Sequence, residues 1–368
     1  TLFCDSAYLN ENKNEIEAFG NVRINQADSI FLNGDYLNYQ GNDKTARVER
    51  NVVLTDGEMT LYTPRLDYNL KTKIGYYQDS GRIINNENTL TSKTGSFDGN
   101  NKMLYFRKNV VLVNPQYTMN SDTLQYHYPT EIAYFFGPTF IKGKDALVYC
   151  ENGWYNTRID YSQFSLNSYI KTEDKILKAD SMVYTGKTGI DQAFRNIILI
   201  DTIQKTEVRG NRGTYYRKLN KTIITQDAIA QVKVEKDTLY LGADTLLTTY
   251  DSLEKNRKIY AYHHVKTFKT DLQTSSDSIF YSLKDSVMFL EGNPIIWTDS
   301  NQISGDSVRI ILKEGKVKEL QIRKNAFICS RLDSTKYNQI KGRDLDGFFE
   351  NNALRVVENW GNGEALYF

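Results

Sequence analysis

A repeat of about 30 residues runs through the chain and constrains what it can fold into. Short apolar segments, often preceded by Gly-Asn or Lys-Asn, recur along the sequence, and the first ones are centred on Val22, Val52, Ile83, Val110 and Thr139. Each of these positions follows the previous one after about 30 residues. The spacing continues to the end of the chain with one weak unit at 168–170, so the 368 residues hold roughly a dozen periods.

A second motif recurs out of phase with the first. It is Asp followed by Ser or Thr and then an apolar residue, with copies that begin at Asp5, Asp28, Asp122, Asp180, Asp244, Asp277 and Asp306. A strand usually follows the motif and ends near a Tyr and a polar turn, so each period is predicted to contain two strands and two turns. We interpret the Asp as a cap for backbone N–H groups at a turn and the Ser or Thr as the start of a strand.

Alternation of apolar and polar residues dominates the segments between the turns, as in Thr60-Leu61-Tyr62-Thr63. No segment has the pattern of a long helix. Thr, Val, Ile, Tyr and Phe, which fit a half-buried pleated surface, fill the strand positions. The residues therefore predict an all-β, antiparallel array without a clear internal boundary, and a hinge is expected near 150–175, where the repeat is weakest.

The charge balance excludes several classes of function. Lys and Arg number 46 and Asp and Glu number 45, which gives no electrostatic basis for binding nucleic acid or a polybasic membrane-surface role. No uninterrupted apolar run approaches the length that a transmembrane helix needs. Because Cys150 and Cys329 are six periods apart in a linear array, a disulfide between them is out of reach, and Cys4, Cys150 and Cys329 are predicted to be free thiols.

Signals for catalysis or metal binding are weak. His127, His263 and His264 are the three histidines, and two adjacent histidines on a strand point to opposite faces, so they cannot both bind one metal. The Asp-Ser/Thr motifs lack the dense glycines of calcium-binding β-rolls. We expect no catalytic residue, no cofactor and no metal, although sequence alone leaves open a carboxylate pair for carbohydrate chemistry.

The apolar strand residues suggest a binding role. A pair of sheets folded over a continuous apolar seam leaves a trough, and a trough that side chains do not fill suits acyl chains, because each buried methylene contributes about 0.8 kcal/mol. The candidate groove residues are Val22, Ile24, Ile30, Leu32, Val52, Leu54, Leu61, Leu66, Val110, Leu112, Met119, Leu124, Met182, Leu246, Ile279 and Val308.

The order of these motifs resembles the OstA/LptA family, the periplasmic proteins of lipopolysaccharide transport. The resemblance is carried by strings in family order along residues 1–150, and a looser version continues to the last strand. The clearest strings are Phe3-Cys4-Asp5-Ser6-Ala7, Ala18-Phe19-Gly20-Asn21-Val22-Arg23-Ile24, Ala27-Asp28-Ser29-Ile30, Asp35-Tyr36-Leu37-Asn38-Tyr39, Leu61-Tyr62-Thr63-Pro64-Arg65-Leu66-Asp67-Tyr68, Ser121-Asp122-Thr123-Leu124-Gln125-Tyr126 and Gly361-Asn362-Gly363-Glu364-Ala365-Leu366-Tyr367-Phe368.

The resemblance implies an elongated β-jellyroll of about a dozen ~30-residue repeats, with two facing antiparallel sheets and an interior that receives the acyl chains of lipid A. Residues 1–150 would form an OstA/LptA-like jellyroll. Residues 151–368 would continue it or form a second stacked jellyroll.

The same resemblance implies a non-enzymatic bridge in the periplasm of a Gram-negative bacterium, with a signal peptide removed. Its partners would be lipopolysaccharide, the inner-membrane exporter and the outer-membrane translocon, through edge-to-edge stacking that also allows end-to-end self-association. The candidate docking residues at the two edges are Phe3, Ala7, Leu9, Ala365, Leu366 and Phe368.

Two other hypotheses stay open from the sequence. One is a structural or adhesive surface protein with a filled core. The other is a polysaccharide-active β-helix enzyme, which would need rungs of constant length and a carboxylate cluster on one face.

Overall fold

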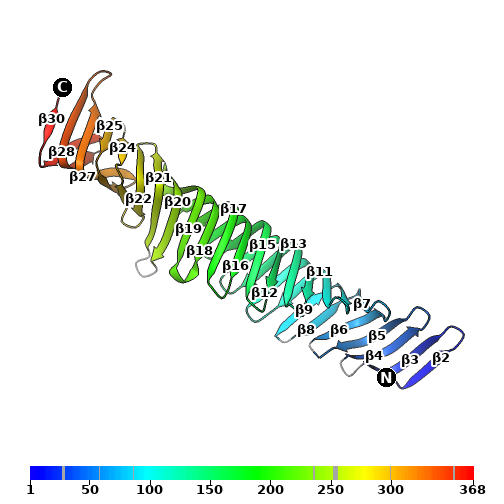
Figure 1. The fold of residues 1–368 in the computed structure, drawn as a ribbon. Coiled ribbons are helices and arrows are strands. Elements are labelled where there is room, and N and C mark those ends of the chain that lie inside the picture. The colour runs from blue at the N-terminus through cyan, green and yellow to red at the C-terminus, as the bar shows by residue number, and fades with distance from the viewer. Residues whose placement is uncertain are drawn as a thin grey trace. The chain divides into compact units, whose positions relative to one another are not determined.

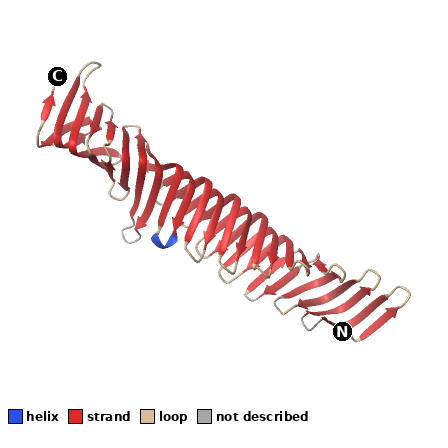
Figure 2. Cartoon of the chain, viewed as in Figure 1, coloured by secondary structure: helices blue, strands red, loops and turns tan. Residues whose placement is uncertain are grey.

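The computed structural model describes the chain except for residues 27–29, 58, 86, 235–236, 252–255, 299 and 351–352. Strands make up nearly all of the regular structure, and their pairings are antiparallel (Figure 2). The one helical element in this described part is η1, a single 3-10 turn at Arg217–Leu219. No helix among the described residues is long and apolar enough to cross a membrane. The all-β, antiparallel prediction is confirmed.

The chain divides into two compact units. Unit 1 is Thr1–Glu173 with Thr185–Lys187, and unit 2 is Asp174–Tyr184 with Thr188–Phe368. The division of the chain at residue 150, and a hinge near 150–175, stay predictions.

Unit 1 contains strands that follow one another in chain order (Figure 1). They are β1 (Leu2–Phe3), β2 (Ser6–Asn10), β3 (Glu15–Gln26), β4 (Ile30–Gln40), β5 (Thr45–Thr55), β6 (Thr60–Asn69), β7 (Ile74–Tyr77), β8 (Gly81–Asn85), β9 (Asn88–Ser92), β10 (Thr94–Asp98), β11 (Met103–Val113), β12 (Tyr117–His127), β13 (Ile132–Gly143), β14 (Leu147–Asn156) and β15 (Tyr161–Lys171).

Unit 2 repeats the same arrangement. Its strands are β16 (Lys175–Thr185), β17 (Ile190–Asp201), β18 (Thr206–Tyr216), β19 (Lys221–Val234), β20 (Asp237–Asp251), β21 (Asn256–Lys269), β22 (Leu272–Ser282), β23 (Val287–Glu291), β24 (Ile295–Thr298), β25 (Asn301–Ser304), β26 (Ser307–Lys313), β27 (Lys316–Arg331), β28 (Tyr337–Glu350), β29 (Ala353–Trp360) and β30 (Glu364–Leu366).

A corner with left-handed residues interrupts the middle of about every second long strand, and the strands between them shift register at the same level. In β5 it consists of Arg50 and Asn51, whose φ values are +62° and +51°, and the strand pairing shifts register between Glu49 and Val52. Equivalent pairs with positive φ are Lys108-Asn109, Leu166-Asn167, Arg195-Asn196, Gln226-Asp227, His263-His264 and Lys324-Asn325. Two consecutive left-handed residues turn the strand, and the ladder resumes beyond them. Each long strand therefore contributes one half to each of two facing sheets.

These corners correct the interpretation of the Gly-Asn and Lys-Asn pairs. Their predicted place is the start of a strand, but Gly20-Asn21 and Lys108-Asn109 lie inside β3 and β11. The period nevertheless holds two strands, because Val22, Val52 and Val110 follow the corners of β3, β5 and β11.

The Asp-Ser/Thr motif also belongs to the corner. Asp122, Asp180 and Asp244 lie inside β12, β16 and β20, so their predicted place at the start of a strand is wrong. Asp5 and Asp306 do precede β2 and β26, and Asp28-Ser29 lies outside the described residues.

The Asp side chain mostly binds a side chain of a corner pair rather than a backbone N–H. Nδ2 of Asn196 donates to Asp180 at 3.1 Å, and Nδ2 of Asn325 donates to Asp306 at 2.9 Å. Asp35, which lies outside the motif, accepts in the same way from Nδ2 of Asn51 at 2.8 Å. In the corner of β21, Nδ1 of His264 lies 2.8 Å from Oδ2 of Asp244.

Replacing Asn51 with Val tests the corner. A β-branched residue at positive φ is strained, so Asn51→Val is expected to lower the free energy of unfolding by about 1–3 kcal/mol. Asn51→Gly accepts the same φ and loses only the hydrogen bond to Asp35, worth about 1 kcal/mol. Thermal unfolding followed by circular dichroism compares the two variants, and equal stability of both would contradict the role assigned to the corner.

Candidate functional site

The two sheets carry rows of apolar side chains that face each other. The strand halves that carry Ile24, Leu32, Leu54 and Leu61 form one sheet, which we call sheet A. The other halves, which carry Leu37, Val48 and Leu66, form sheet B. Within unit 1 the row in sheet A passes through directly paired residues from one strand to the next: Ile24, Leu32, Leu54, Leu61, Ile83, Leu90, Leu112, Met119, Ile141, Val148 and Ile170. Cross-strand pairs of this kind stabilise a sheet and give it a continuous apolar inner face.

Unit 2 is built in the same way. Its sheet A carries Leu177, Leu199, Val208, Ala230 and Leu241 in direct succession. Its sheet B carries Met182, Ala193, Gly213, Ile224, Leu246, Ala261, Ile279, Leu290, Val308, Ile322 and Leu345.

All sixteen candidate groove residues lie on strands of these sheets, and none is exposed. Ile24, Ile30, Leu54 and Leu112 are half-buried, whereas the others are buried. Those in unit 2, which are Met182, Leu246, Ile279 and Val308, are at most 2 % exposed. Their role in lipid binding stays a prediction.

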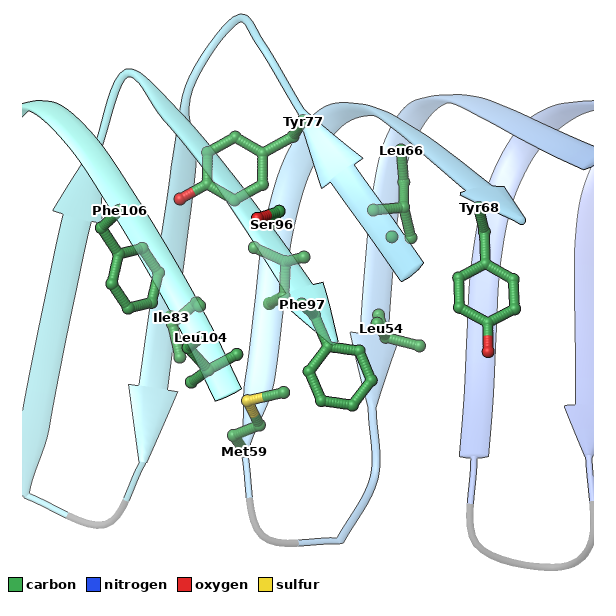
Figure 3. A pocket seen from close by; sticks show the side chains of 12 residues that line it. Leu54, Met59, Leu66, Tyr68, Tyr77, Ile83, Ser96, Phe97, Leu104 and Phe106 are labelled. Carbon is green, nitrogen blue, oxygen red and sulfur yellow. The ribbon is translucent and has the colours of Figure 1, made fainter. Parts of the chain in front are cut away.

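An apolar cavity lies between the two sheets in unit 1 (Figure 3). Its enclosed volume is about 20 Å³, within about 380 Å³ of empty space that includes open solvent. Its wall consists of Leu54, Met59, Leu61, Leu66, Tyr68, Gly75, Tyr77, Ile83, Ser96, Phe97, Leu104 and Phe106. The candidates Leu54, Leu61 and Leu66 are brought together here.

A second and larger cavity adjoins the first and shares Met59, Ile83, Leu104 and Phe106 with it. Its enclosed volume is about 60 Å³, within about 710 Å³ of empty space that includes open solvent, and the candidates Leu112 and Leu124 line it. Its polar residues come from the outer ends of both sheets: Asp56, Asn85, Asn88, Tyr117, Tyr126, Tyr128 and Thr157. This cavity therefore reaches the line where the free ends of the two sheets face each other, which we call the mouth.

The chemistry of the two cavities suits hydrocarbon. No Lys, Arg or His is among the described residues that line them, and Asp56 is the one charged group among these at the rim. Burying an apolar chain in such a space is favourable by about 0.8 kcal/mol per methylene. An unpaired charged group would lose its hydration there.

Tyr77 shapes the wall of the smaller cavity. Its hydroxyl forms a hydrogen bond of 2.6 Å with Oγ of Ser92, and burial raises the pKa of Tyr77 to about 12. Gly81 and Gly95 lie against the ring so closely that a Cβ on Gly95 would stand 2.5 Å from it. These glycines make room for an aromatic wall.

Tyr117 marks the mouth of unit 1. Its ring contacts the ring of Tyr155 edge-on at 6.1 Å between centroids. Tyr117 belongs to sheet A and Tyr155 to sheet B, so this neutral contact spans the mouth. Burial raises the pKa of Tyr117 to about 12, with the charges of nearby Tyr126 and Asp160 acting in the same direction. Tyr117 is therefore uncharged near neutral pH, and the contact leaves the larger cavity open beside it.

Several lining residues were not among the sequence candidates. They are Met59, Tyr68, Tyr77, Ile83, Leu90, Phe97, Leu104, Phe106, Tyr126 and Ala133. A signal for two of them was present, because Tyr39, Tyr68, Tyr126 and Tyr155 follow one another after one, two and one periods of the repeat. From the sequence pattern, a Tyr at this position indicates only the end of a strand.

The six candidate docking residues lie at the first and last strands. Phe3, on β1, and Ala7 and Leu9, on β2, are exposed, and both strands pair with β3. Ala365 and Leu366 on β30 and the terminal Phe368 are also exposed, and β30 pairs with β28. Among the described residues neither β1, β2 nor β30 has a second partner strand, so the two edges are available for pairing.

The histidines stand apart from the interior. His263 and His264 belong to the corner of β21, and each faces a different carboxylate, Asp277 for His263 and Asp244 for His264. Within the described parts of the chain, no group of three or more His, Cys, Asp or Glu side chains could hold a metal. Cys4, Cys150 and Cys329 are free, which confirms the thiol prediction.

The fold and its interior define a class: an antiparallel β-jellyroll protein whose two sheets enclose an apolar groove. Two family models match the chain. The model described as "OstA-like protein" matches residues 1–122 and 97–180, and the model described as "LptA/(LptD N-terminal domain) LPS transport protein" matches residues 207–316. The chain is an OstA/LptA-like protein of lipopolysaccharide transport.

Among solved structures, the chain is similar to LptH from Pseudomonas aeruginosa, described as the LptA homologous periplasmic component of the conserved lipopolysaccharide transport device. The identity is 15%, the match covers 32% of this chain and 82% of LptH, and the TM-score is 0.28. No curated protein matches the chain. The family assignment therefore stands on the two family models.

Gly95 tests how closely the cavity wall is packed. Gly95→Ala is expected to lower the free energy of unfolding by about 1–3 kcal/mol, because the new methyl group displaces Tyr77 from its contact with Ser92. Gly242→Ala is the matched control, since a Cβ there meets no atom within 4 Å. Urea unfolding measures the loss of stability in both variants. Equal losses would show that the Tyr77 ring moves aside without cost.

Proposed function

We propose that this protein binds lipopolysaccharide in the periplasm of a Gram-negative bacterium and passes it along the groove between its two sheets, with lipid A acyl chains inside. The observation that carries the proposal is the pair of adjoining apolar cavities in unit 1, which reach the mouth and have no cationic residue in their described lining. Such a site can hold the hydrocarbon while the sugar and phosphate groups stay outside in water.

The larger cavity separates apolar and polar surfaces in the way this cargo requires. Leu90, Leu112 and Leu124 line its inner part, while Asn85, Asn88 and Tyr128 belong to its rim. Neutral hydrogen-bonding groups at the rim can meet the linkage between acyl chain and sugar without an ion pair. The proposed transport needs no catalysis, because the cargo is moved and not changed.

The two competing hypotheses fit the structure less well. A β-helix enzyme is built from parallel strands, whereas the pairings here are antiparallel. A structural protein with a filled core does not need the two adjoining apolar cavities of unit 1 that open between the sheets.

Photo-crosslinking from Tyr126 tests cargo binding. Tyr126 lines the larger cavity, and benzoylphenylalanine is close to it in shape. In cells that make lipopolysaccharide, irradiation is expected to give a lipopolysaccharide adduct at this position. The matched control is Tyr62, which is 43 % exposed and alternates with the inward-facing Leu61 on β6. Adducts at neither position, or equally at both, would overturn the proposal.

The exposed edges support the second half of the proposal, a bridge that docks edge to edge with the inner-membrane exporter, the outer-membrane translocon or another copy of itself. An unpaired strand offers backbone donors and acceptors to a neighbouring chain. Leu9 is 63 % exposed on β2 and Phe3 is 55 % exposed on β1.

Charges on the first edge test the docking. The double variant Phe3→Lys and Leu9→Lys is expected to weaken self-association, because lysines on an edge strand oppose pairing. The measurement is co-purification of two differently tagged copies. Leu219→Lys is the control, because Leu219 is 67 % exposed but lies in η1, away from both edges. Equal co-purification of all three proteins would rule out docking through this edge.

A further inference from the structure

The mouth of unit 2 differs from the mouth of unit 1. In unit 2, sheet A ends at residues such as Lys175, Asp201 and Val234, and sheet B ends at Tyr250 and Arg257 and at the turn that contains Gly315. Side chains from these two sets of ends meet each other.

An ion pair spans the mouth. The guanidinium of Arg257, on the sheet B half of β21, forms a salt bridge with the carboxylate of Asp201, at the sheet A end of β17. Their side chains are only 7 % and 3 % exposed. The Asp201 carboxylate also accepts hydrogen bonds from the backbone N–H groups of Ile203 at 3.0 Å and Gln204 at 2.8 Å. The acidic partner is thus held in place by its own turn.

A cation–π contact also joins the two sets of ends. Nζ of Lys175, at the end of sheet A, lies 5.9 Å from the centroid of the Tyr250 ring in sheet B. The guanidinium of Arg257, which pairs with Tyr250 within sheet B, lies 5.5 Å from the same centroid. Farther along unit 2, Gly315 approaches Val234 so closely that a Cβ on it would stand 2.7 Å from a Val234 methyl group. The two sheets therefore touch at their free ends as well as at the corner.

Burial at the strand ends varies along unit 2. Leu239 and Leu272, which lie at or near the start of strands farther along the mouth, are 1 % and 0 % exposed. Beside the ion pair, Leu177 and Leu199 of the inner row of sheet A are half-buried, as are Ile24, Leu54 and Leu112 in unit 1.

Stability alone does not account for the ion pair. Removing two charges from water costs several kcal/mol per ion, and an apolar pair of similar volume is often at least as stable. Nε of Arg257 is buried and has no hydrogen-bond partner, so the pairing is incomplete. A closure made of such a pair can open at low cost when water or another group replaces the partner.

We propose that Asp201 and Arg257 form a latch that closes the mouth of unit 2 to acyl chains, so that these two residues determine which part of the interior accepts cargo. The proposal rests on the proposed function for its cargo. Unit 1, whose mouth is spanned by the neutral Tyr117–Tyr155 contact, takes acyl chains without any opening step.

Photo-crosslinking at two positions tests the latch. Tyr126 reports on unit 1, and Tyr281, which is 4 % exposed on the inner face of β22 beside Ile259 and Met288, reports on unit 2. Each position receives benzoylphenylalanine in the full chain. With the latch intact, lipopolysaccharide adducts are expected at Tyr126 and only weakly at Tyr281. The double variant Asp201→Asn and Arg257→Ala is expected to raise the Tyr281 adduct about tenfold and to leave the Tyr126 adduct unchanged.

Two control variants separate a latch from a structural tie. Arg257→Lys keeps a cation opposite Asp201 and leaves the hydrogen bonds of the Asp201 turn in place, so it is expected to keep the Tyr281 adduct near the original yield. Glu131→Gln with Arg158→Ala removes an exposed pair of unit 1 and is expected to change neither adduct. A double variant that only melts at a lower temperature, with no gain of adduct at Tyr281, would overturn the latch.

Hydrogen exchange gives a readout that needs no cargo. Loss of the latch is expected to speed exchange in the strand ends around Asp201 and Arg257 and to leave unit 1 unchanged. Absence of adducts at Tyr126 in every variant would overturn the proposed function, and exchange would then decide the latch separately. Unchanged exchange in the double variant, or strong adducts at Tyr281 with the latch intact, would overturn the latch.

Discussion

The pair of left-handed residues in the middle of about every second long strand is the constraint on which the rest of the structure depends. A strand that continued straight through Arg50 and Asn51, or through Lys324 and Asn325, would produce one flat sheet with two solvated faces. The corner folds each strand so that its two halves face each other and bury their apolar sides. The Asn–Asp hydrogen bonds that follow the corners connect neighbouring strands at the bend, where the backbone ladder shifts register.

The register between neighbouring strands aligns the corners, so that their apolar halves form one continuous groove. Because side chains alternate between the two faces of a strand, the same row of paired positions faces inward on every strand as long as the corners stay aligned. The row from Ile24 to Ile170 shows this alignment across unit 1. Whether the interior is filled or open then depends on side-chain size. In unit 1, the small residue Gly75 lies among large residues in the wall of the smaller cavity. Ala133 has the same place in the wall of the larger cavity.

The sequence predicted the fold better than the site. Period and alternation identify strands, count two of them in each period and pick out buried positions such as Val22 and Leu124, because burial on one face imposes that pattern. They could not show that Gly-Asn marks a corner inside a strand, since Gly and Asn favour turns and corners alike. Nor could they find Phe106 or Tyr77 at the cavity. Whether a residue lines a cavity depends on which residues of the facing sheet lie opposite it. The angle of the corner sets which residues those are.

With the proposed latch, one architecture can be open or closed with few changes. Corners and inner rows are built alike in both units, so the difference lies at the free ends of the sheets. Where those ends carry aromatic and amide groups, as at Tyr117 and Asn88, the contact across the mouth is neutral and leaves space beside it. Where they carry Asp201 and Arg257, opposite charges meet with little water to screen them, so their attraction acts over the short distance between the sheets. Substitution of one or two side chains removes a charge pair, whereas the corner is formed by the backbone of the strand. Any adjustable element of the groove is therefore expected at its mouth.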